Sequence, residues 1–451
     1  AFDATIRPDF SQIESDVVQL AVNSRFAIFY PEKRPFFMEG SDLLGSPIQA
    51  IHTRTITSPL WGARLTGRPG NHAYTLVVAD DRGGGSVIVP GPAFSSLAPQ
   101  PSDTLAVLGR YRYGHGRSSG GLLLTSRTSR DGAYANHVAG PDVLWWFSPA
   151  DRLTAQWLAS RTTEDGSTRG GHAATVAWDR TARSYAWNVT LRDFDANFRA
   201  DSGFVPQSGV RSASARASLL RYPKSKWLSR LLPDLVGERI EERGGLLVSS
   251  AVYPRVYLEG WRATVAFFEY RENEKVRARD GSLHEQDYAY AMMRFLVSRR
   301  VPYLRLAARH GDELDVASAR VGRGTALTMT ATLVPVDRLQ VDVTGENHRL
   351  GLGGRPLFDA RMLRVLATWT FSQRAFVRGI AERRDVEWNE ELAPGRTSSH
   401  GPLNGSLLFG YRINWQTSLY AGFVEGPQQE VFVKLSYAIH PTGALFRKEH
   451  S

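Results

Sequence analysis

The chain has 451 residues, with 55 Lys and Arg against 45 Asp and Glu, and a net charge of +10 at pH 7. The basic residues are spread along the whole chain without a compact basic run, so we expect no nucleic-acid partner. The absence of cysteine excludes disulfides, thiolate metal sites and cysteine nucleophiles.

The first notable element is the stretch FYPEKRPFFMEGSDLL, residues 29–44, where charged residues stand between pairs of aromatic ones. Buried charges must be paired, so a polar cavity enclosed by protein suits this stretch better than an apolar core does. We therefore expect residues 1–45 to form an N-terminal latch or plug. Its site residues would be Glu32, Lys33, Arg34, Phe36, Phe37 and Glu39.

From residue 46 onward, apolar and polar residues alternate with period two, which is typical of half-buried strands. Between residues 326 and 344 the sequence predicts a hairpin with one apolar and one polar face, turning at Pro335-Val336-Asp337. The same alternation recurs at residues 187–192, 363–371, 406–414 and 431–437. Helical periodicity is nearly absent. In the one candidate, residues 227–243, Pro233 interrupts the pattern and favours a short helix or a structured loop.

Gly-, Asp- and Ser-rich segments separate the expected strands, and they are read as loops longer than the PVD turn: residues 114–121, 163–171, 279–287 and 383–401. Short turns on one side and long loops on the other are typical of outer-membrane barrels. The sequence therefore predicts an all-β fold in which residues 46–451 form a transmembrane antiparallel up-and-down β-barrel of about 18–20 strands. A soluble sandwich or propeller is the alternative, but no blade-length repeat is visible.

The segment PDFSQIESDVVQLAVNSRFAIFYPEKRPFFMEG, residues 8–40, resembles part of a bacterial family known as a domain of unknown function. The motifs PEKRPFF and GFVP, the latter at residues 203–206, are its specific parts, and generic strand matches extend the resemblance over nearly all of the chain. The resemblance implies an outer-membrane-type β-barrel that usually follows a family-nine-like carbohydrate-binding domain. Such a domain, or a subunit of a larger complex, is therefore an expected partner.

With apolar residues facing lipid, the inward-facing set of the barrel is rich in arginine. It consists of Arg110, Arg112, Arg192, Arg305, Arg309, Arg364, Arg412 and Lys434. We expect this lumen to favour anions, because rings of Arg and Lys do so in other channels. We also expect some of its arginines to pair with Glu32 or Glu39 of the latch. Alternatively, the arginines pair with loop carboxylates or bind lipopolysaccharide phosphates at the rim.

No catalytic or metal-binding signature is present, since the sequence lacks HExxH, GxSxG and GxxxxGK[ST]. The adjacent pairs Glu241-Glu242 and Glu390-Glu391 are read as loop residues rather than as a glycosidase dyad. We therefore expect no enzyme activity and no cofactor.

The predicted function is a pore or transport-linked barrel of the bacterial outer membrane for small polar or saccharide-like solutes, in contact with outer-membrane lipids and lipopolysaccharide. The alternative is an occluded, non-conducting barrel that anchors a partner protein. A surface carbohydrate hydrolase is the third class.

Overall fold

The computed structural model describes residues 1–7, 20, 22–414, 417–425 and 430–437. Strands dominate these residues. The first half of the chain contains β1 (Phe2–Ile6), β2 (Pro59–Gly67), β3 (His72–Asp81), β4 (Gly85–Pro90), β5 (Ser95–Gln100), β6 (Thr104–His115), β7 (Ser118–Ser129), β8 (Ala135–Trp146), β9 (Asp151–Glu164), β10 (Ser167–Thr181), β11 (Tyr185–Phe194) and β12 (Val210–Leu219). The second half contains β13 (Leu228–Glu242), β14 (Leu247–Gly260), β15 (Val265–Arg277), β16 (Leu283–Phe295), β17 (Tyr303–Asp315), β18 (Arg320–Val336), β19 (Leu339–Leu352), β20 (Arg355–Thr370), β21 (Ala375–Trp388), β22 (Ser399–His400), β23 (Asn404–Arg412), β24 (Thr417–Val424) and β25 (Glu430–Tyr437).

Four short helical segments complete the secondary structure: α1 (Pro35–Met38), η1 (Ser41–Leu43), η2 (Thr53–Thr55) and η3 (Trp261–Ala263). None of the helices in the described ranges is long or apolar enough to cross a membrane.

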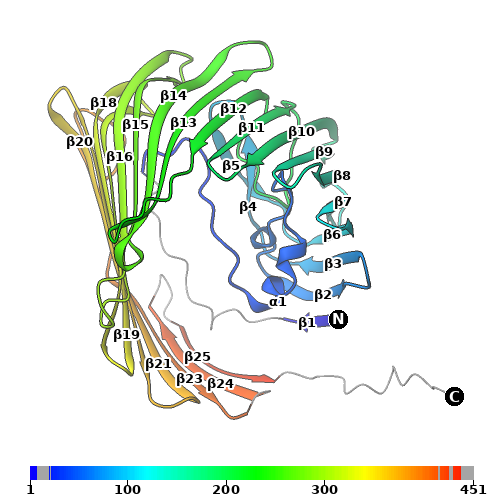
Figure 1. The fold of residues 1–451 in the computed structure, drawn as a ribbon. Coiled ribbons are helices and arrows are strands. Elements are labelled where there is room, and N and C mark those ends of the chain that lie inside the picture. Colours follow the sequence, from blue (N-terminus) through cyan, green and yellow to red (C-terminus); the bar gives the residue numbers. More distant parts are fainter. Residues whose placement is uncertain (8–19, 21, 415–416, 426–429, 438–451) are drawn as a thin grey trace.

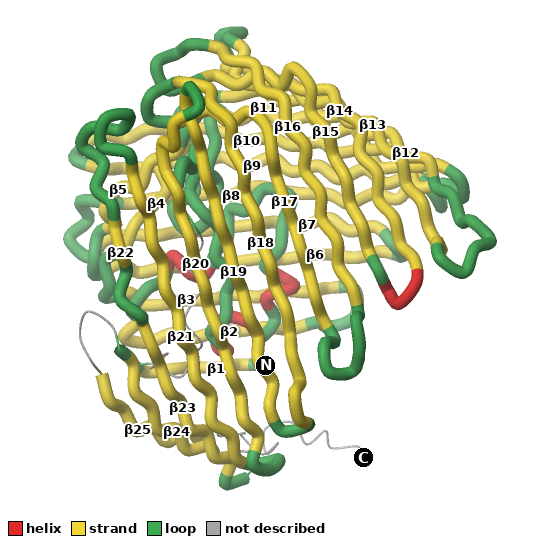
Figure 2. The backbone as a smooth tube through the Cα atoms, turned by 90° about the vertical axis from the view of Figure 1, so that its left-hand side faces the viewer, coloured by secondary structure: helices red, strands yellow, loops and turns green. Residues whose placement is uncertain are grey.

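The strands form one curved antiparallel sheet in which chain neighbours pair from β1 to β25, as Figures 1 and 2 show. The hairpin β4–β5 is excluded from it and forms a separate two-stranded sheet, so β3 pairs directly with β6. The predicted all-β, up-and-down arrangement is confirmed. Between β25 and β1 no pairing is present among the described residues, and the sheet is open there.

The sheet has 23 strands, more than the predicted 18–20, although β22 has only two residues. Several connections are tighter than the sequence suggested. Residues 114–121 and 163–171, read as loops, are mostly strand, because β6 and β7 are joined by Gly116-Arg117 alone and β9 and β10 by Asp165-Gly166 alone. Shorter connections leave room for more strands.

Residues 227–243 contain β13 rather than a helix or a loop, which corrects the sequence prediction. Pro233 lies within the strand opposite Val256 of β14. Asp234 is buried on the inner face, where it pairs with Arg216 of β12 at 2.8 Å and Arg255 of β14 at 2.9 Å. The alternation of apolar and polar residues does not reveal cross-strand ion pairs of this kind. These pairs hold this segment in the sheet.

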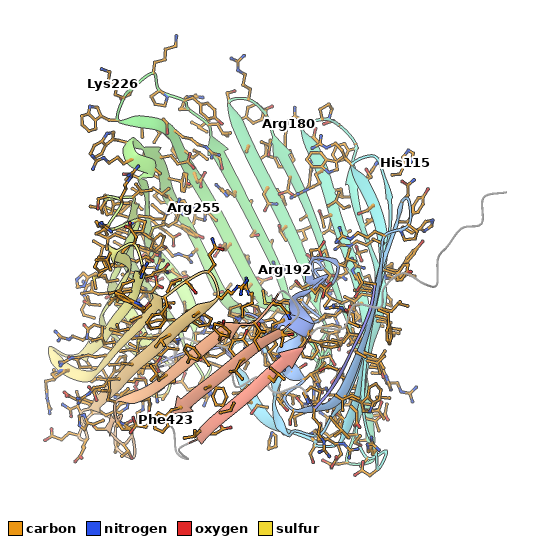
Figure 3. The ribbon with its side chains drawn as sticks, turned by 90° about the horizontal axis from the view of Figure 1, so that it is seen from below. His115, Arg180, Arg192, Lys226, Arg255 and Phe423 are labelled. Carbon is orange, nitrogen blue, oxygen red and sulfur yellow. The ribbon has the colours of Figure 1, made fainter. Side chains whose placement is uncertain are left out.

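The outer face of the sheet carries large apolar side chains that no protein covers. Leu327, Leu363, Leu407 and Val433 are 48%, 53%, 53% and 73% exposed, and they belong to faces predicted to be lipid-facing. Phe423, labelled in Figure 3, lies on the same outer side. A soluble protein rarely exposes apolar surface this extensive, so this face is suited to a hydrocarbon environment.

Inside the curve lies the N-terminal segment with α1, η1 and η2, next to the wall formed by β2–β10 (Figure 1). β1 pairs with β2, and the chain rejoins the sheet only at Pro59. The boundary at residue 45 between a latch and a barrel stays a prediction.

Candidate functional site

The charged centre of the N-terminal segment is organised around Arg34, whose side chain is buried. Its guanidinium donates to the Glu32 carboxylate at 2.7–2.8 Å and to the carbonyls of Ile56 at 2.6 Å and Thr53 at 2.7 Å. It also lies over the ring of Phe37, 4.4 Å from the centroid. The arginine thus joins two stretches of the segment, residues 32–37 and 53–56, into one folded unit.

The aromatic and acidic residues that follow fasten this unit to β2. Phe36 and Phe37 pack edge to face, with centroids 5.0 Å apart. Arg64 of β2, which is buried, pairs at 2.7 Å with both Glu39 and Asp3. Arg64 therefore connects the segment, β1 and the wall through one guanidinium. Lys33 is half-buried beside Glu32, and its backbone N–H donates to that carboxylate at 3.0 Å.

An apolar contact surface lies between the segment and the wall. Phe37, Leu44, Ile48, Ile51 and Ile56 are buried in one cluster with inward-facing residues of β3 and β6–β10, which are Val77, Ala79, Ala106, Leu108, Leu123, Val138, Leu158 and Ala173. The inner face of this half of the sheet is therefore a hydrophobic core rather than a wet lumen surface. The sequence prediction, which assigned all inner faces to polar residues, did not anticipate it.

The GFVP loop between β11 and β12 closes over the segment. The Phe204 N–H donates to the Gln49 carbonyl at 2.8 Å, and the His52 N–H donates to the Ser202 carbonyl at 2.7 Å. Gly203 fits because a Cβ there would lie 2.6 Å from the Gln49 oxygen and 2.7 Å from Ala50. The structure thus brings together PEKRPFF and GFVP, the two motifs that carried the sequence resemblance.

Two groups in this site have shifted pKa values. Burial acts to raise the pKa of Glu32, but its hydrogen bonds and charge interaction with Arg34, together with the Thr53 hydroxyl, outweigh burial and lower the pKa to about 2. Burial lowers the pKa of His52 to about 4, and the nearby Arg54 and Arg34 contribute in the same direction, against Glu32. At neutral pH the site therefore holds a charged Glu32 and a neutral His52.

A cavity of about 500 Å³ lies beside this contact, between residues 24–30, the hairpin β4–β5 and the GFVP loop. Phe26, Tyr30, Phe204 and Leu97 give it apolar walls, and Ser86, Ser95 and Asp201 supply polar groups. Two hydrogen bonds join the hairpin to residues 25–27: the Ser95 N–H donates to the Arg25 carbonyl at 3.1 Å, and the Ala27 N–H donates to the Ser95 hydroxyl at 2.8 Å.

Opposite this covered wall, the inner face of β12–β21 is rich in ion pairs. An apolar cluster that includes Phe358 and Val386 interrupts it on β19–β21 and packs against Leu20 and Val22 of the N-terminal segment. Arg271 contacts Glu269 and Glu274 at 2.7 Å and lies over the Tyr253 ring at 3.9 Å. Farther along, Arg309 pairs with Glu313 at 3.0 Å. Glu313 also accepts from the Asn23 side chain at 2.8 Å, so the N-terminal segment is tied to this wall as well.

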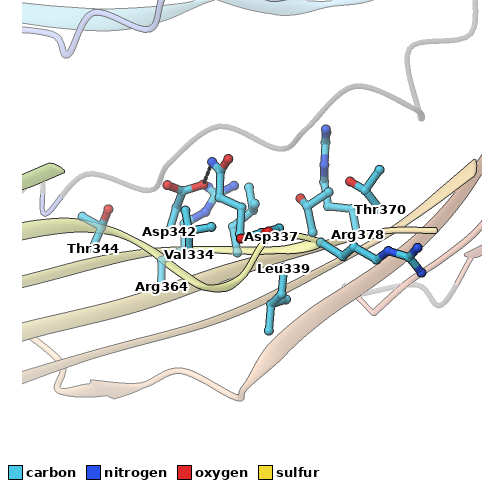
Figure 4. A pocket seen from close by; sticks show the side chains of 12 residues that line it. Val334, Asp337, Leu339, Asp342, Thr344, Arg364, Thr370 and Arg378 are labelled. Carbon is cyan, nitrogen blue, oxygen red and sulfur yellow. Dashed lines mark hydrogen bonds between the residues drawn. The ribbon is translucent and has the colours of Figure 1, made fainter. Parts of the chain in front are cut away.

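A second cavity, of about 480 Å³, lies on this polar wall near the turn between β18 and β19 (Figure 4). Its lining includes Asp342, Thr344, Arg364, Thr370 and Arg378. The Gln340 amide donates to Asp342 at 2.8 Å, as the dashed line in Figure 4 marks. Acidic, basic and hydroxyl side chains together make this surface suited to water and polar solutes.

The predicted lumen residues lie on the inner face, but many have protein partners. Arg110 pairs with Asp142, Arg309 with Glu313, and Arg364 lies 3.6 Å from Glu382. Arg112 donates to the Gly45 carbonyl, and Arg305 to the Tyr290 hydroxyl at 3.4 Å.

The remaining three face the same interior. Arg192 points into the space that the sheet encloses in Figure 3, as does Arg255, which lies outside the predicted set. Arg412 lies between the exposed Tyr411 and Ile413, and Lys434 between the exposed Val433 and Leu435, so both occupy inward positions.

The expected pairing of lumen arginines with the latch is wrong for its acidic residues. Glu32 pairs with Arg34 of its own segment, and Glu39 with Arg64, an arginine outside the predicted set. The interior also holds carboxylates, including Asp142, Asp234, Glu269, Glu313 and Glu382. The lumen is therefore less strongly basic than its arginine content suggests.

Several residues of the site carried no sequence signal. Arg127, fully buried, donates to Asp81 at 3.2 Å and to the Thr55 carbonyl at 2.8 Å. Asn23 and His52 are single residues without a motif, and their partners lie far away in the sequence. GFVP differs from these residues, because the sequence resemblance had already marked it.

The carboxylate pairs are placed as follows. Glu241-Glu242 ends β13 instead of lying in a loop, while Glu390-Glu391 follows β21. Over the described residues, no group of three or more His, Cys, Asp or Glu side chains is placed to hold a metal ion.

Comparison with known proteins gives one family match. Residues 1–49 match the model described as "Domain of unknown function (DUF5916)". This agrees with the resemblance at residues 8–40 and does not extend over the rest of the chain. No curated protein matches the chain significantly.

The solved structures to which the chain is similar include receptors and transporters at low identity. The siderophore receptor PirA from Acinetobacter baumannii has a TM-score of 0.47 and 8% identity, with 84% of this chain and 77% of that chain covered. The unliganded ferric citrate transporter FecA has 0.47 and 10%, with 94% and 84% covered. A mutant of the ferric enterobactin receptor PfeA from Pseudomonas aeruginosa has 0.48 and 9%, with 81% and 71% covered. These scores lie below 0.5, and the fold described above rests on this chain's own strand pairing.

Proposed function

We propose that the protein is a transport-linked barrel of the bacterial outer membrane, and that its N-terminal segment is a plug that narrows a passage for small polar solutes. The outward apolar face supports the membrane location, since covering it with hydrocarbon removes it from water. The observation that carries the plug is the Arg34 centre, which joins residues 32–37 and 53–56 into one unit through buried hydrogen bonds. Arg64 of β2 and the apolar cluster then fasten this unit to the inner wall.

The passage would run between the plug and the polar wall of β12–β21. Ion pairs such as Arg271 with Glu269 and Arg216 with Asp234 present both charges to the interior. Such a surface suits neutral or zwitterionic polar solutes, saccharides included. We propose no catalytic step and no cofactor.

A second candidate is the occluded, non-conducting barrel that anchors a partner. The extensive apolar contact between the segment and β3–β10 favours it, because a plug buried in this way leaves its wall only at considerable cost in free energy. The partner would then bind outside the barrel.

Solute efflux from proteoliposomes separates the two. The double variant Glu32→Gln/Arg34→Gln removes the charges of the centre and should loosen the plug. We expect sucrose to leave vesicles faster with this variant than with the unaltered protein, while a large dextran is retained. The matched control is Lys275→Gln/Glu285→Gln, which removes a more exposed pair 3.5 Å apart. Correctly inserted variant protein without sucrose efflux would favour the anchor.

A further inference from the structure

The outer face carries a layer of arginines next to its apolar band. At the rim that holds the GFVP loop, these exposed residues follow the last outward apolar positions of their strands: Arg161, Arg211, Arg239, Arg323, Arg349, Arg361 and Arg383. Outward-facing acids such as Asp359, Asp385 and Glu241 come two residues farther from the band than Arg361, Arg383 and Arg239. The guanidiniums therefore stand at the depth at which a bilayer presents its headgroups.

A groove on the outer face ends at two of these arginines. It encloses about 860 Å³ over β16–β20. Exposed Met293, Leu306, Leu327 and Met329 form its apolar sides, and the small residues Ala291, Ala308 and Gly345 form its floor. Arg349 and Arg361 lie at its rim end. The groove thus combines a hydrocarbon-lined channel with a cationic end.

The two arginines at the cationic end share one carboxylate as a direct partner. Arg349 and Arg361 both contact the Asp359 carboxylate at 2.7 Å. The Asp359 side chain is only 17% exposed, whereas those of Arg349 and Arg361 are 59% and 55% exposed. Asp385 and Glu387 also act electrostatically on Arg361 from the neighbouring strand β21. Two guanidiniums that share one direct carboxylate partner still have N–H donors left over for an anion.

We propose that this groove binds lipid A, with an acyl chain along the apolar channel and a sugar phosphate on Arg349 and Arg361. The inference rests on the proposed outer-membrane location. Outside the N-terminal segment, the longest connections between sheet strands are residues 82–103, 195–209 and 389–398. All three leave this rim, and long loops face the cell exterior in outer-membrane barrels. The groove therefore faces the outer leaflet. A phosphate monoester carries more than one negative charge at neutral pH, which suits two guanidiniums that share one acid.

Native mass spectrometry of the detergent-purified protein tests the proposal, with bis-phosphorylated lipid A as the probe. We expect Arg349→Gln/Arg361→Gln to weaken lipid A binding about tenfold, the factor that corresponds to 1.4 kcal/mol. Arg262→Gln, an exposed arginine of η3 at the opposite rim, is the control and should bind as the unaltered protein does.

A second variant tests the channel without touching any charge. A Cβ at Gly345 would meet no atom within 4 Å, so Gly345→Leu should fold and fill the floor of the groove. We expect it to weaken lipid A binding as well. Equal binding by all variants, or equal binding of phosphatidylglycerol, would overturn the proposal. The groove lies on the outer face, so lipid A binding does not depend on the interior passage. Protein that binds lipid A but conducts nothing would therefore contradict the transport proposal and leave the lipid A proposal standing.

Discussion

The ring of Phe204 packs edge to face against the ring of Phe29, with centroids 5.1 Å apart. The His52 ring contacts both, with its centroid 4.9 Å from that of Phe29 and 6.0 Å from that of Phe204. Phe29 belongs to the N-terminal segment and Phe204 to the loop after β11, so this cluster joins the N-terminal segment to the sheet. Its integrity depends on the close backbone approach at Gly203.

Replacing Gly203 with valine should separate the loop from the plug. The new side chain would collide with the Gln49 carbonyl and Ala50, and overpacking of this kind costs about 1–3 kcal/mol. We expect earlier thermal unfolding of the plug and faster proteolysis near residues 45–55. Gly244→Ala, where a Cβ meets no atom within 4 Å, is the control. Unchanged proteolysis in Gly203→Val would show that this contact does not hold the plug.

Glu32 should make the plug acid-sensitive. Its pKa of about 2 lies below the ordinary 4.5, so its stabilisation is complete above pH 4.5 and is lost as the pH falls toward 2. Glu32→Gln should cost about 3 kcal/mol at pH 7, because the buried Arg34 would lose its charged partner. The measurement is the free energy of plug unfolding as a function of pH. If this free energy falls between pH 4.5 and 2 with the same slope in Glu32→Gln as in the unaltered protein, the assignment to Glu32 is contradicted.

His52 should act in a different pH window. Its pKa of about 4 lies below the ordinary 6.5, so the unfolded segment takes up the proton first, and stability falls as the pH drops from 6.5 toward 4. His52→Phe keeps a ring against Phe29 and Phe204 but cannot be protonated. We expect His52→Phe to abolish the loss of stability between pH 6.5 and 4.5 and to retain the loss of stability below pH 4.5. If the variant still loses stability between pH 6.5 and 4.5, that loss comes from a group other than His52.

Neighbouring positions on β20 should respond oppositely to a charge. Val365 shares the outer face with the exposed Leu363, and Leu366 lines the polar cavity inside. Val365→Arg should cost about 2–4 kcal/mol in a bilayer, as charges on lipid faces do. Leu366→Arg should cost less, because water reaches it. Equal costs in lipid-vesicle unfolding would contradict the assignment of the two faces.

Much of the fold could be predicted because alternation determines which face of each strand is apolar. Leu327 and Met329 on β18 and Leu363 on β20 lie outward as their pattern indicated. The strand count and β13 could not be predicted in the same way. Two-residue turns such as Asp165-Gly166 look like loops in a Gly-rich sequence, and Asp234 stabilises β13 only through arginines on neighbouring strands.

The site was predictable only in part, for a related reason. The mixture of charges and aromatic rings in residues 29–44 indicated an enclosed polar setting, and Arg34 is buried there with its charge paired. The inner face that the N-terminal segment contacts was wrongly predicted to be polar. Small inward residues such as Ala79, Ala106 and Ala173 do not mark that face as apolar in an alternating pattern. Their burial depends on the plug that covers them.

Current through a planar bilayer tests the plugged passage most directly. The unaltered protein and Gly244→Ala should insert with small conductance, because the plug narrows the interior. Gly203→Val should insert with the same sheet structure and a larger conductance. Equal, large currents in all three would contradict the plug, and the absence of current in all three would contradict the passage.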